Sequence, residues 1–158
     1  MSEDARFEDA AEAPLRLRAL DEEDLRVISS LVQDAVTQTS EMRWKVGQRR
    51  FACLLNRFRW EDARRAERHG DYERVRSVLV IEDALSVRSL GLVPGEAAVT
   101  SLLAIAFQPG EDGGGRVVLT FAGDGAVEVT VEALEVTLTD VTRPYLAPSG
   151  HAPSHERS

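Results

Sequence analysis

Cysteine is almost absent from this chain of 158 residues, and long hydrophobic runs are lacking altogether. The one cysteine, Cys53, excludes an intrachain disulfide and makes a reducing cytoplasm the simplest location. No apolar run approaches the roughly 20 residues that cross a bilayer, so we expect no membrane span. Residues 1–13 are acidic and lack the apolar core of a signal peptide, so we do not expect one.

Residues that mark catalysis or cofactor binding are equally sparse. The glycines at 113–115 are followed by a predicted strand, without the helix and the Lys-Ser/Thr pair of a phosphate loop. His69 lies in a charged segment, His151 and His155 lie near the end of the chain, and no pair is spaced for a metal. Cys53 alternates with apolar neighbours, which predicts a buried, inert thiol. We expect no catalytic residues, no metal site and no cofactor.

The net charge of −8 is unevenly distributed. Residues 43–76 contain 11 Arg or Lys against 5 Asp or Glu, a local charge of +6, and the remainder carries −14. The overall negative charge argues against bulk attraction to nucleic acid or an anionic membrane. The local excess of arginine, interleaved with aromatic residues, is the one compositional feature that indicates a partner.

A hairpin within residues 116–141 is the clearest structural signal. Apolar residues occupy every second position on both sides of Gly123-Asp124-Gly125, which is typical of two half-buried strands joined by a turn. A three-residue loop puts all of these apolar side chains on one face, and we expect Gly125 in the left-handed region. The predicted pairs are Phe121 with Val127, Leu119 with Val129 and Val117 with Val131.

Upstream, the sequence predicts a strand, a helix and a second hairpin. Residues 15–19 alternate as a strand. Asp21 and the three acidic residues after it are typical of a helix N-cap and first turn, and apolar residues at helical spacing up to Val36 predict about four turns. Residues 42–46 and 51–55 alternate as two strands joined by a four-residue loop. The predicted pairs are Val46 with Phe51, Trp44 with Cys53 and Met42 with Leu55.

The alternation changes phase near Asn56 and again near Ala133, and we expect a bulge or corner at each position. A helical turn within residues 131–138 is an alternative at the second position. Residues 61–73 predict a polar loop or a short exposed helix, and residues 75–90 predict one strand or two with a turn at 82–84. Residues 99–107 are nearly all apolar or small, which predicts a central strand covered on both faces.

Together these elements predict the α+β class, with a bent, mainly antiparallel sheet or partial barrel of about seven or eight strands and one packed amphipathic helix. The length and the 43% of hydrophobic residues fit a single domain. We expect that domain at residues 14–142. It would lie between a flexible acidic tail at residues 1–13 and a flexible tail at residues 143–158.

Several stretches carry a family resemblance. They are Leu15–Asp21, Glu23–Leu25, Leu31–Val36, Arg49–Glu61, Leu102–Phe107, Val118–Gly123 and Thr139–Val141. In this order they resemble an uncharacterised bacterial family, the domain of unknown function 2948, over about residues 14–142. The resemblance implies a small cytoplasmic protein, and it supplies no activity and no site residues to carry over.

The lopsided charge and the missing catalytic pattern favour a non-catalytic binding or accessory protein in the cytoplasm, acting on a protein partner or by self-association. One alternative is a binder of an anionic ligand or nucleic acid through segment 43–76, and another is an enzyme of unrecognised type. The surface for the anionic alternative would be Arg49, Arg50, Arg57, Arg59 and Trp60. In the plainer interpretation, aromatic side chains point inward and the arginines pair on the surface with nearby Glu and Asp.

Overall fold

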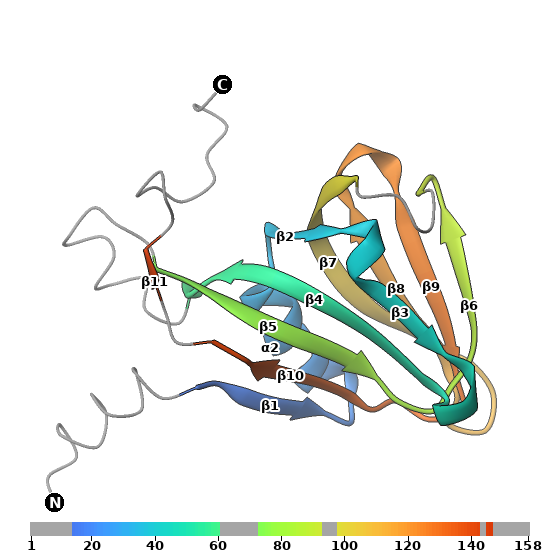
Figure 1. Ribbon diagram of the computed structural model, residues 1–158. Helices are drawn as coiled ribbons and strands as arrows, with labels where there is room; N and C mark the ends of the chain where they lie inside the picture. Colours follow the sequence, from blue (N-terminus) through green and yellow to red (C-terminus); the bar gives the residue numbers. More distant parts are fainter. Residues whose placement is uncertain (1–13, 61–72, 93–97, 143–144, 147–158) are drawn as a thin grey trace, which may run out of the picture.

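A computed structural model describes residues 14–60, 73–92, 98–142 and 145–146. Within these residues, eleven strands form one antiparallel sheet that carries a single α-helix, α2 (Glu22–Leu31) (Figure 1). The strands are β1 (Arg16–Ala19), β2 (Ala35–Gln38), β3 (Met42–Lys45), β4 (Arg50–Phe58), β5 (Glu73–Ile81), β6 (Ala84–Leu90), β7 (Val99–Pro109), β8 (Gly115–Phe121), β9 (Ala126–Val131), β10 (Val136–Asp140) and β11 (Tyr145–Leu146). The α+β class and the bent, mainly antiparallel sheet are confirmed. The sheet is open, and its strands outnumber the predicted seven or eight.

Strand β2 links two four-stranded halves of the sheet. The order is β1-β10-β5-β4-β2-β7-β8-β9-β6, with β3 added to β4 and β11 added to β5. Four residues of β2 pair with β7, whereas only Val36 pairs with β4, opposite Asn56. The sheet therefore bends where β2 leaves β4, and Figure 1 shows the strands of the two halves running in different directions.

Helix α2 begins as predicted and ends earlier. The Asp21 carboxylate accepts a hydrogen bond from the backbone N–H of Asp24 at 2.8 Å, as an N-cap does. The helix has ten residues, because Asp34 adopts a φ of 64° and Ala35 already belongs to β2. The prediction of four turns is therefore wrong. Ala35 is still buried like the helical residues before it, so the same apolar run serves a helix and then a strand.

The inward faces of both halves and of α2 meet in one buried cluster. Helix α2 packs against β7 and β1, and its Leu25 and Ile28 are buried. Inward residues of the 117–131 hairpin, such as Leu119 and Phe121, are buried in the same cluster. The prediction that the apolar side chains of this hairpin share one inward face is confirmed. A single core therefore holds the two halves of the bent sheet together.

The register of the hairpin differs from the prediction by two residues. Leu119 pairs with Val127 and Val117 with Val129. The left-handed residues are Gly123 and Asp124, with φ of 77° and 65°, whereas Gly125 has a φ of −82°, so the prediction for Gly125 is wrong. A shift of two residues keeps every side chain on the same face, so alternation alone does not detect it.

The hairpin of β3 and β4 shows the same two-residue shift. Trp44 pairs with Phe51, whereas the predicted partner was Cys53. Met42 pairs with Cys53, whereas the predicted partner was Leu55. The short helix η2 (Val46–Gln48) and the left-handed Arg49, with a φ of 52°, form the connection. Val46 is consequently 65% exposed and does not belong to the predicted inward set.

The predicted bulge near Asn56 is wrong, and the predicted corner near Ala133 is confirmed. Strand β4 pairs with β5 in regular register from Phe51 to Phe58, and Arg57 occupies the next inward position. The phase of the apolar residues slips there because a buried arginine replaces a hydrophobic residue. Near Ala133 the chain leaves β9 without a helical turn, and β10 pairs in the other half of the sheet.

Two further strand predictions are partly correct. The chain turns between β5 and β6 at residues 82–83, but β6 pairs with β9 and not with β5. Strand β7 is central, between β2 and β8, yet Leu103 on its outer face is 42% exposed, so coverage of both faces is wrong. Strand β11, within the predicted flexible tail, pairs with β5. The polar segment at 61–72, the tail at 1–13 and the other residues of the predicted C-terminal tail lie outside the described residues.

Gly115, at the start of β8, offers a direct test of the close packing. A Cβ atom there would overlap the backbone oxygen of Gln108 and lie 2.9 Å from the ring of Phe107. We expect Gly115→Ala to lower the free energy of unfolding by at least about 2 kcal/mol, measured by urea denaturation. In the matched control, Gly47→Ala, the new Cβ meets no atom within 4 Å, and an equal loss there would contradict the packing explanation.

Candidate functional site

The five residues predicted as one surface lie at three separate places along β4. Arg49 precedes β4 and Arg50 is its first residue, Arg57 is its second-to-last residue, and Arg59 and Trp60 follow it. A strand of nine residues is about 27 Å long at the usual rise per residue. The structure therefore does not bring the five residues together into one patch.

Arg49 and Arg50 are paired at a corner of the sheet. Arg49 forms an ion pair with Glu132, and the Arg50 Nε lies 2.7 Å from the Glu82 carboxylate. These hydrogen bonds and the charge of each partner raise the pKa of both guanidinium groups. Backbone hydrogen bonds join the same segments, including Ala84 N–H to the Arg49 oxygen at 2.9 Å. Both arginines thus match the plainer interpretation of surface pairing.

Arg57 is a structural residue, because its side chain is fully buried. Its Nη2 lies 3.0 and 3.1 Å from the two carboxylate oxygens of Asp140, and its Nε donates to the Ser77 hydroxyl at 3.0 Å. Asp140 also accepts from Ser77 at 2.6 Å and from the Leu15 N–H at 2.8 Å. The carboxylate therefore connects β4, β5 and β10 with the segment before β1.

Arg59 and Trp60 are also engaged within the protein. Arg59 is 3% exposed, and its Nη1 lies 3.3 Å from a carboxylate oxygen of Glu73. The Trp60 indole N–H donates to the backbone oxygen of Gln33 at 2.9 Å, and its ring lies 5.7 Å from that of Phe58. Both side chains secure the segment after β4 to its surroundings.

A cleft lies between the two edge strands β3 and β6, and we call it the edge cleft. Its volume is about 280 Å³. It is lined by Thr39, Met42, Trp44, Phe51, Val87, Ser89, Leu92 and Val127. Among the described residues, β3 pairs only with β4, and β6 pairs only with β9. The cleft is thus an apolar cavity with a sheet edge on each side.

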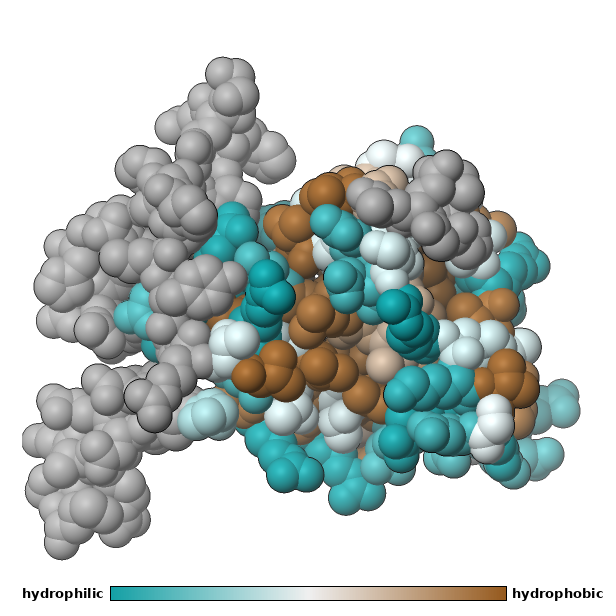
Figure 2. All heavy atoms as spheres, in the orientation of Figure 1, coloured by the Kyte–Doolittle hydropathy of each residue, from teal (hydrophilic) through white to brown (hydrophobic). Residues whose placement is uncertain are grey.

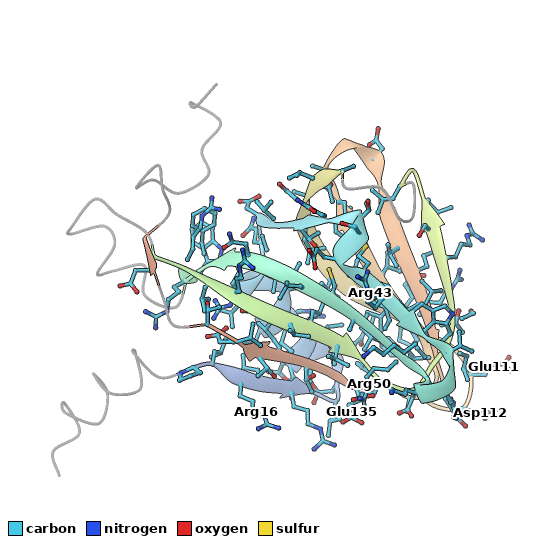
Figure 3. The ribbon with its side chains drawn as sticks, viewed as in Figure 1. Arg16, Arg43, Arg50, Glu111, Asp112 and Glu135 are labelled. Carbon is cyan, nitrogen blue, oxygen red and sulfur yellow. The ribbon has the colours of Figure 1, made fainter. Side chains whose placement is uncertain are left out.

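Cations border the edge cleft. Arg43 and Lys45 on β3 and Arg88 on β6 are exposed and alternate with the residues that face the cavity. Within the described part of the chain, none of the three forms an ion pair. Figure 2 shows hydrophobic surface in the middle of the molecule, over β4 and β5, with hydrophilic residues around it, and Figure 3 shows Arg43 on β3.

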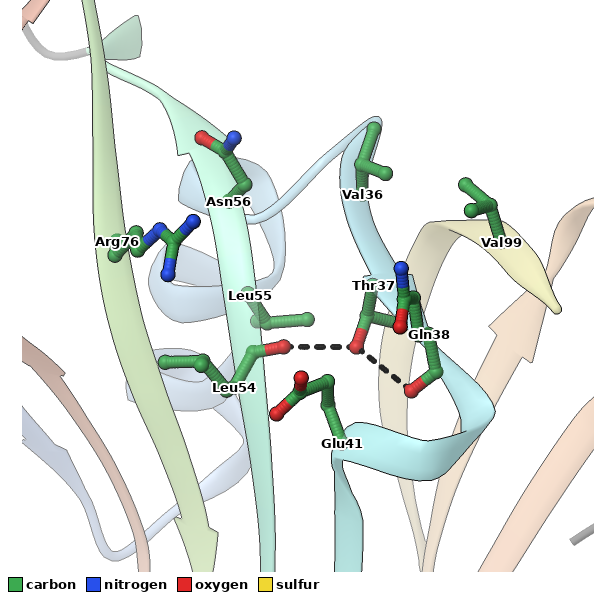
Figure 4. Close-up of a pocket in the computed structure, with 9 residues that line it drawn as sticks. All are labelled: Val36, Thr37, Gln38, Glu41, Leu54, Leu55, Asn56, Arg76 and Val99. Atoms are coloured by element: carbon green, nitrogen blue, oxygen red, sulfur yellow. Dashed lines mark hydrogen bonds between the residues drawn. The ribbon is translucent and has the colours of Figure 1, made fainter. Parts of the chain in front are cut away.

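A second cavity, which we call the split groove, opens where β2 leaves β4. Its volume is about 180 Å³ (Figure 4). It is lined by Val36, Thr37, Gln38, Glu41, Leu54, Leu55, Asn56, Arg76 and Val99. The Thr37 hydroxyl crosses the gap and donates to the Leu54 oxygen at 2.7 Å, in place of the backbone pairing that the strands lose there. The groove thus combines polar, charged and apolar side chains.

Sequence reasoning assigned some residues of these cavities to the core and missed the cavities themselves. Met42 and Trp44 were predicted as inward residues, and they are only partly buried because they face the edge cleft. Arg76, at the end of the predicted basic segment, lines the split groove. The basic segment was the one sequence signal for these cavities, but its charge did not indicate which strands would lie side by side and enclose them.

Cys53 is fully buried, as predicted. Burial raises the pKa of its thiol to about 11, although a hydrogen bond with Thr37 opposes the shift. Within the residues that the structure describes, no three His, Cys, Asp or Glu side chains come together in an arrangement for a metal. The three histidines lie outside those residues. In the same part of the chain, α2 is too short and too polar to cross a membrane.

The buried ion pair predicts an asymmetric response to substitution. Arg57→Met leaves the Asp140 charge buried without its partner, and we expect a loss of about 3–5 kcal/mol in the free energy of unfolding. Adding Asp140→Asn removes that charge and should restore at least about 1 kcal/mol. Arg50→Met, which breaks an exposed pair on the same strand, should cost under about 1 kcal/mol. Equal losses for Arg57→Met and Arg50→Met, by urea denaturation, would contradict this assignment.

The thiol provides a separate test of burial. At pH 8 a group with a pKa of about 11 is ionised at roughly one part in a thousand, so Cys53 should react slowly with Ellman's reagent. We expect the rate to rise at least about a hundredfold in denaturant, where the thiol has its ordinary pKa and is accessible. Equal rates in buffer and in denaturant would show that Cys53 is accessible.

Neither a curated protein nor a solved structure is similar enough to this chain to count as a match. The model of a family described as a protein of unknown function, DUF2948, matches residues 15–155. The match covers most of the chain, including every described helix and strand from β1 to β11. The chain therefore belongs to the DUF2948 family.

Proposed function

We propose that this chain is a non-catalytic binding protein of the bacterial cytoplasm whose partner is an extended segment of another protein. The observation that carries the proposal is the edge cleft, in which two sheet edges flank one apolar cavity. A reduced, buried Cys53 and the absence of disulfides are compatible with a cytoplasmic location.

The edges of β3 and β6 supply backbone groups for a partner strand. Each strand pairs on one side only within the described residues, so its other side presents N–H and C=O groups. An added strand satisfies such groups, and its alternate side chains point to opposite faces. Every second side chain of the partner would therefore enter the cavity, where Met42, Trp44 and Val87 provide apolar contacts.

The charges around the cleft select which strand fits. A basic strand is repelled by the three cations Arg43, Lys45 and Arg88. A purely apolar strand is also disfavoured, because the cations would lose water on binding without gaining a partner of opposite charge. A strand that alternates apolar with acidic residues places its apolar groups in the cavity and its carboxylates near the cations. The expected partner is therefore an extended segment with apolar and acidic residues in alternation.

Selection from a random displayed-peptide library tests the proposal. We expect the unmodified protein to enrich peptides in which Asp or Glu alternates with Val, Ile, Leu or Phe. Ser89→Phe places a large side chain in the cavity from an exposed position and should abolish the enrichment. The pair Arg43→Glu and Lys45→Glu should remove the acidic preference, because the charge of the rim is reversed.

A matched control changes the net charge by the same amount as the pair Arg43→Glu and Lys45→Glu, but leaves the cleft intact. Arg16→Glu with Arg26→Glu alters two exposed arginines, on β1 and α2, that do not line the cleft. This control should select the same peptides as the unmodified protein. No enrichment, or enrichment that Ser89→Phe leaves unchanged in a folded variant, would refute the proposed site. A doubling of mass by light scattering that Ser89→Phe removes would make a second copy of the chain the occupant instead.

A further inference from the structure

We propose that the split groove is a binding site for a small zwitterion, namely a free amino acid with an apolar side chain. The groove lies between β2 and β4, on the outer face of the sheet, and Arg76 and Glu41 reach it from two sides (Figure 4). This inference is independent of the partner strand proposed for the edge cleft, because the two cavities share no lining residue.

The groove exists because two neighbouring strands of the sheet, β2 and β4, separate after a single pair of residues. Val36 and Asn56 form the only pair of β2 and β4, and the strands then diverge toward η1 (Thr39–Glu41). The Thr37 hydroxyl bridges the gap to the Leu54 oxygen at 2.7 Å and fixes its width from inside. Rigid strands thus form both walls, which favours a preformed site over one that must be ordered on binding.

Two opposite charges line the groove and do not neutralise each other. Among the described residues, the Arg76 guanidinium and the Glu41 carboxylate form no ion pair, with one another or with other groups. Arg76 lies on β5, which pairs with one side of β4, and Glu41 lies in η1, just before β3, which pairs with the other side of β4. The two charged side chains therefore approach the groove from opposite sides of β4, which leaves a place between them for a molecule with both charges.

Asn56 lines the groove beside Arg76, at a paired position on the neighbouring strand. Among the described residues, its buried Oδ1 atom has no hydrogen-bond partner, and this atom is not accessible from the cavity. The charged groups that a polar guest meets in the groove are therefore those of Arg76 and Glu41.

The remaining walls favour an apolar side chain on that guest. Val36, Leu54 and Val99 line the groove, and Val99 is 65% exposed. Burial of apolar surface against these residues would stabilise a bound aliphatic group. A simple anion would be attracted by Arg76 but repelled by Glu41. A simple cation would be attracted by Glu41 but repelled by Arg76. A zwitterion with an aliphatic side chain is the small molecule that fits the Arg76 charge, the Glu41 charge and the apolar walls together.

Calorimetric titration with L-leucine, using the full chain, tests this site. We expect binding that weakens at least about tenfold with N-acetyl-L-leucine, which lacks the ammonium charge, and with L-leucinamide, which lacks the carboxylate. Arg76→Gln and Glu41→Gln should each weaken the binding of L-leucine by at least about tenfold. Because both side chains are exposed, these substitutions are compatible with an unchanged fold, which thermal melting would verify.

Arg26→Gln on α2 serves as the matched control, because it removes an exposed charge outside both cavities and should leave L-leucine binding unchanged. The proposal is overturned if L-leucine does not bind at about 10 mM, a concentration that corresponds to negligible affinity. Equal binding of L-leucine and its two blocked forms would overturn it as well. Unchanged binding by folded Arg76→Gln and Glu41→Gln variants would show that the molecule binds elsewhere.

Discussion

The need to bury the inner face of one open sheet governs this structure. Apolar residues line one side of nearly every strand, and a flat sheet would leave them in water. Bending at β2 lets the two halves and α2 share a single core, which includes Leu25, Leu79 and Leu119. The bend separates β2 from β4, and it leaves β3 and β6 as edges that do not join. Both candidate binding sites are therefore consequences of the curvature.

A buried ion pair stabilises one half of the bent sheet. The Asp140 carboxylate receives hydrogen bonds from Arg57, Ser77 and the Leu15 backbone, so groups far apart in the chain are joined at one acceptor. Such a pair contributes less to net stability than an apolar cluster of the same volume, because both charges lose their water. Its geometric requirement is stricter than that of apolar packing. The pair thus favours one arrangement of β4, β5 and β10 over alternatives with similar burial.

The arginines illustrate how a basic segment serves different purposes in one fold. Arg57 is internal, Arg49 and Arg50 secure a corner, and Arg59 is held against Glu73. Cations that form no ion pair with another described residue, such as Lys45 and Arg76, lie beside the two cavities instead. The cations in the described part of this segment are therefore divided between structural pairing and the borders of candidate sites.

The sequence by itself determined the fold class, the N-cap at Asp21 and which residues of the hairpins face inward, because these follow from local periodicity and local hydrogen bonds. It did not determine register, since a slip of two residues, as for Val117 and Val129, preserves every face. Only the tertiary structure decided that Arg57 is buried, because Asp140, its partner, is 83 residues away. It also decided that β6 joins β9 and not β5, and that the strands open at two places to form cavities. Those outcomes depend on contacts between distant segments, which local patterns do not encode.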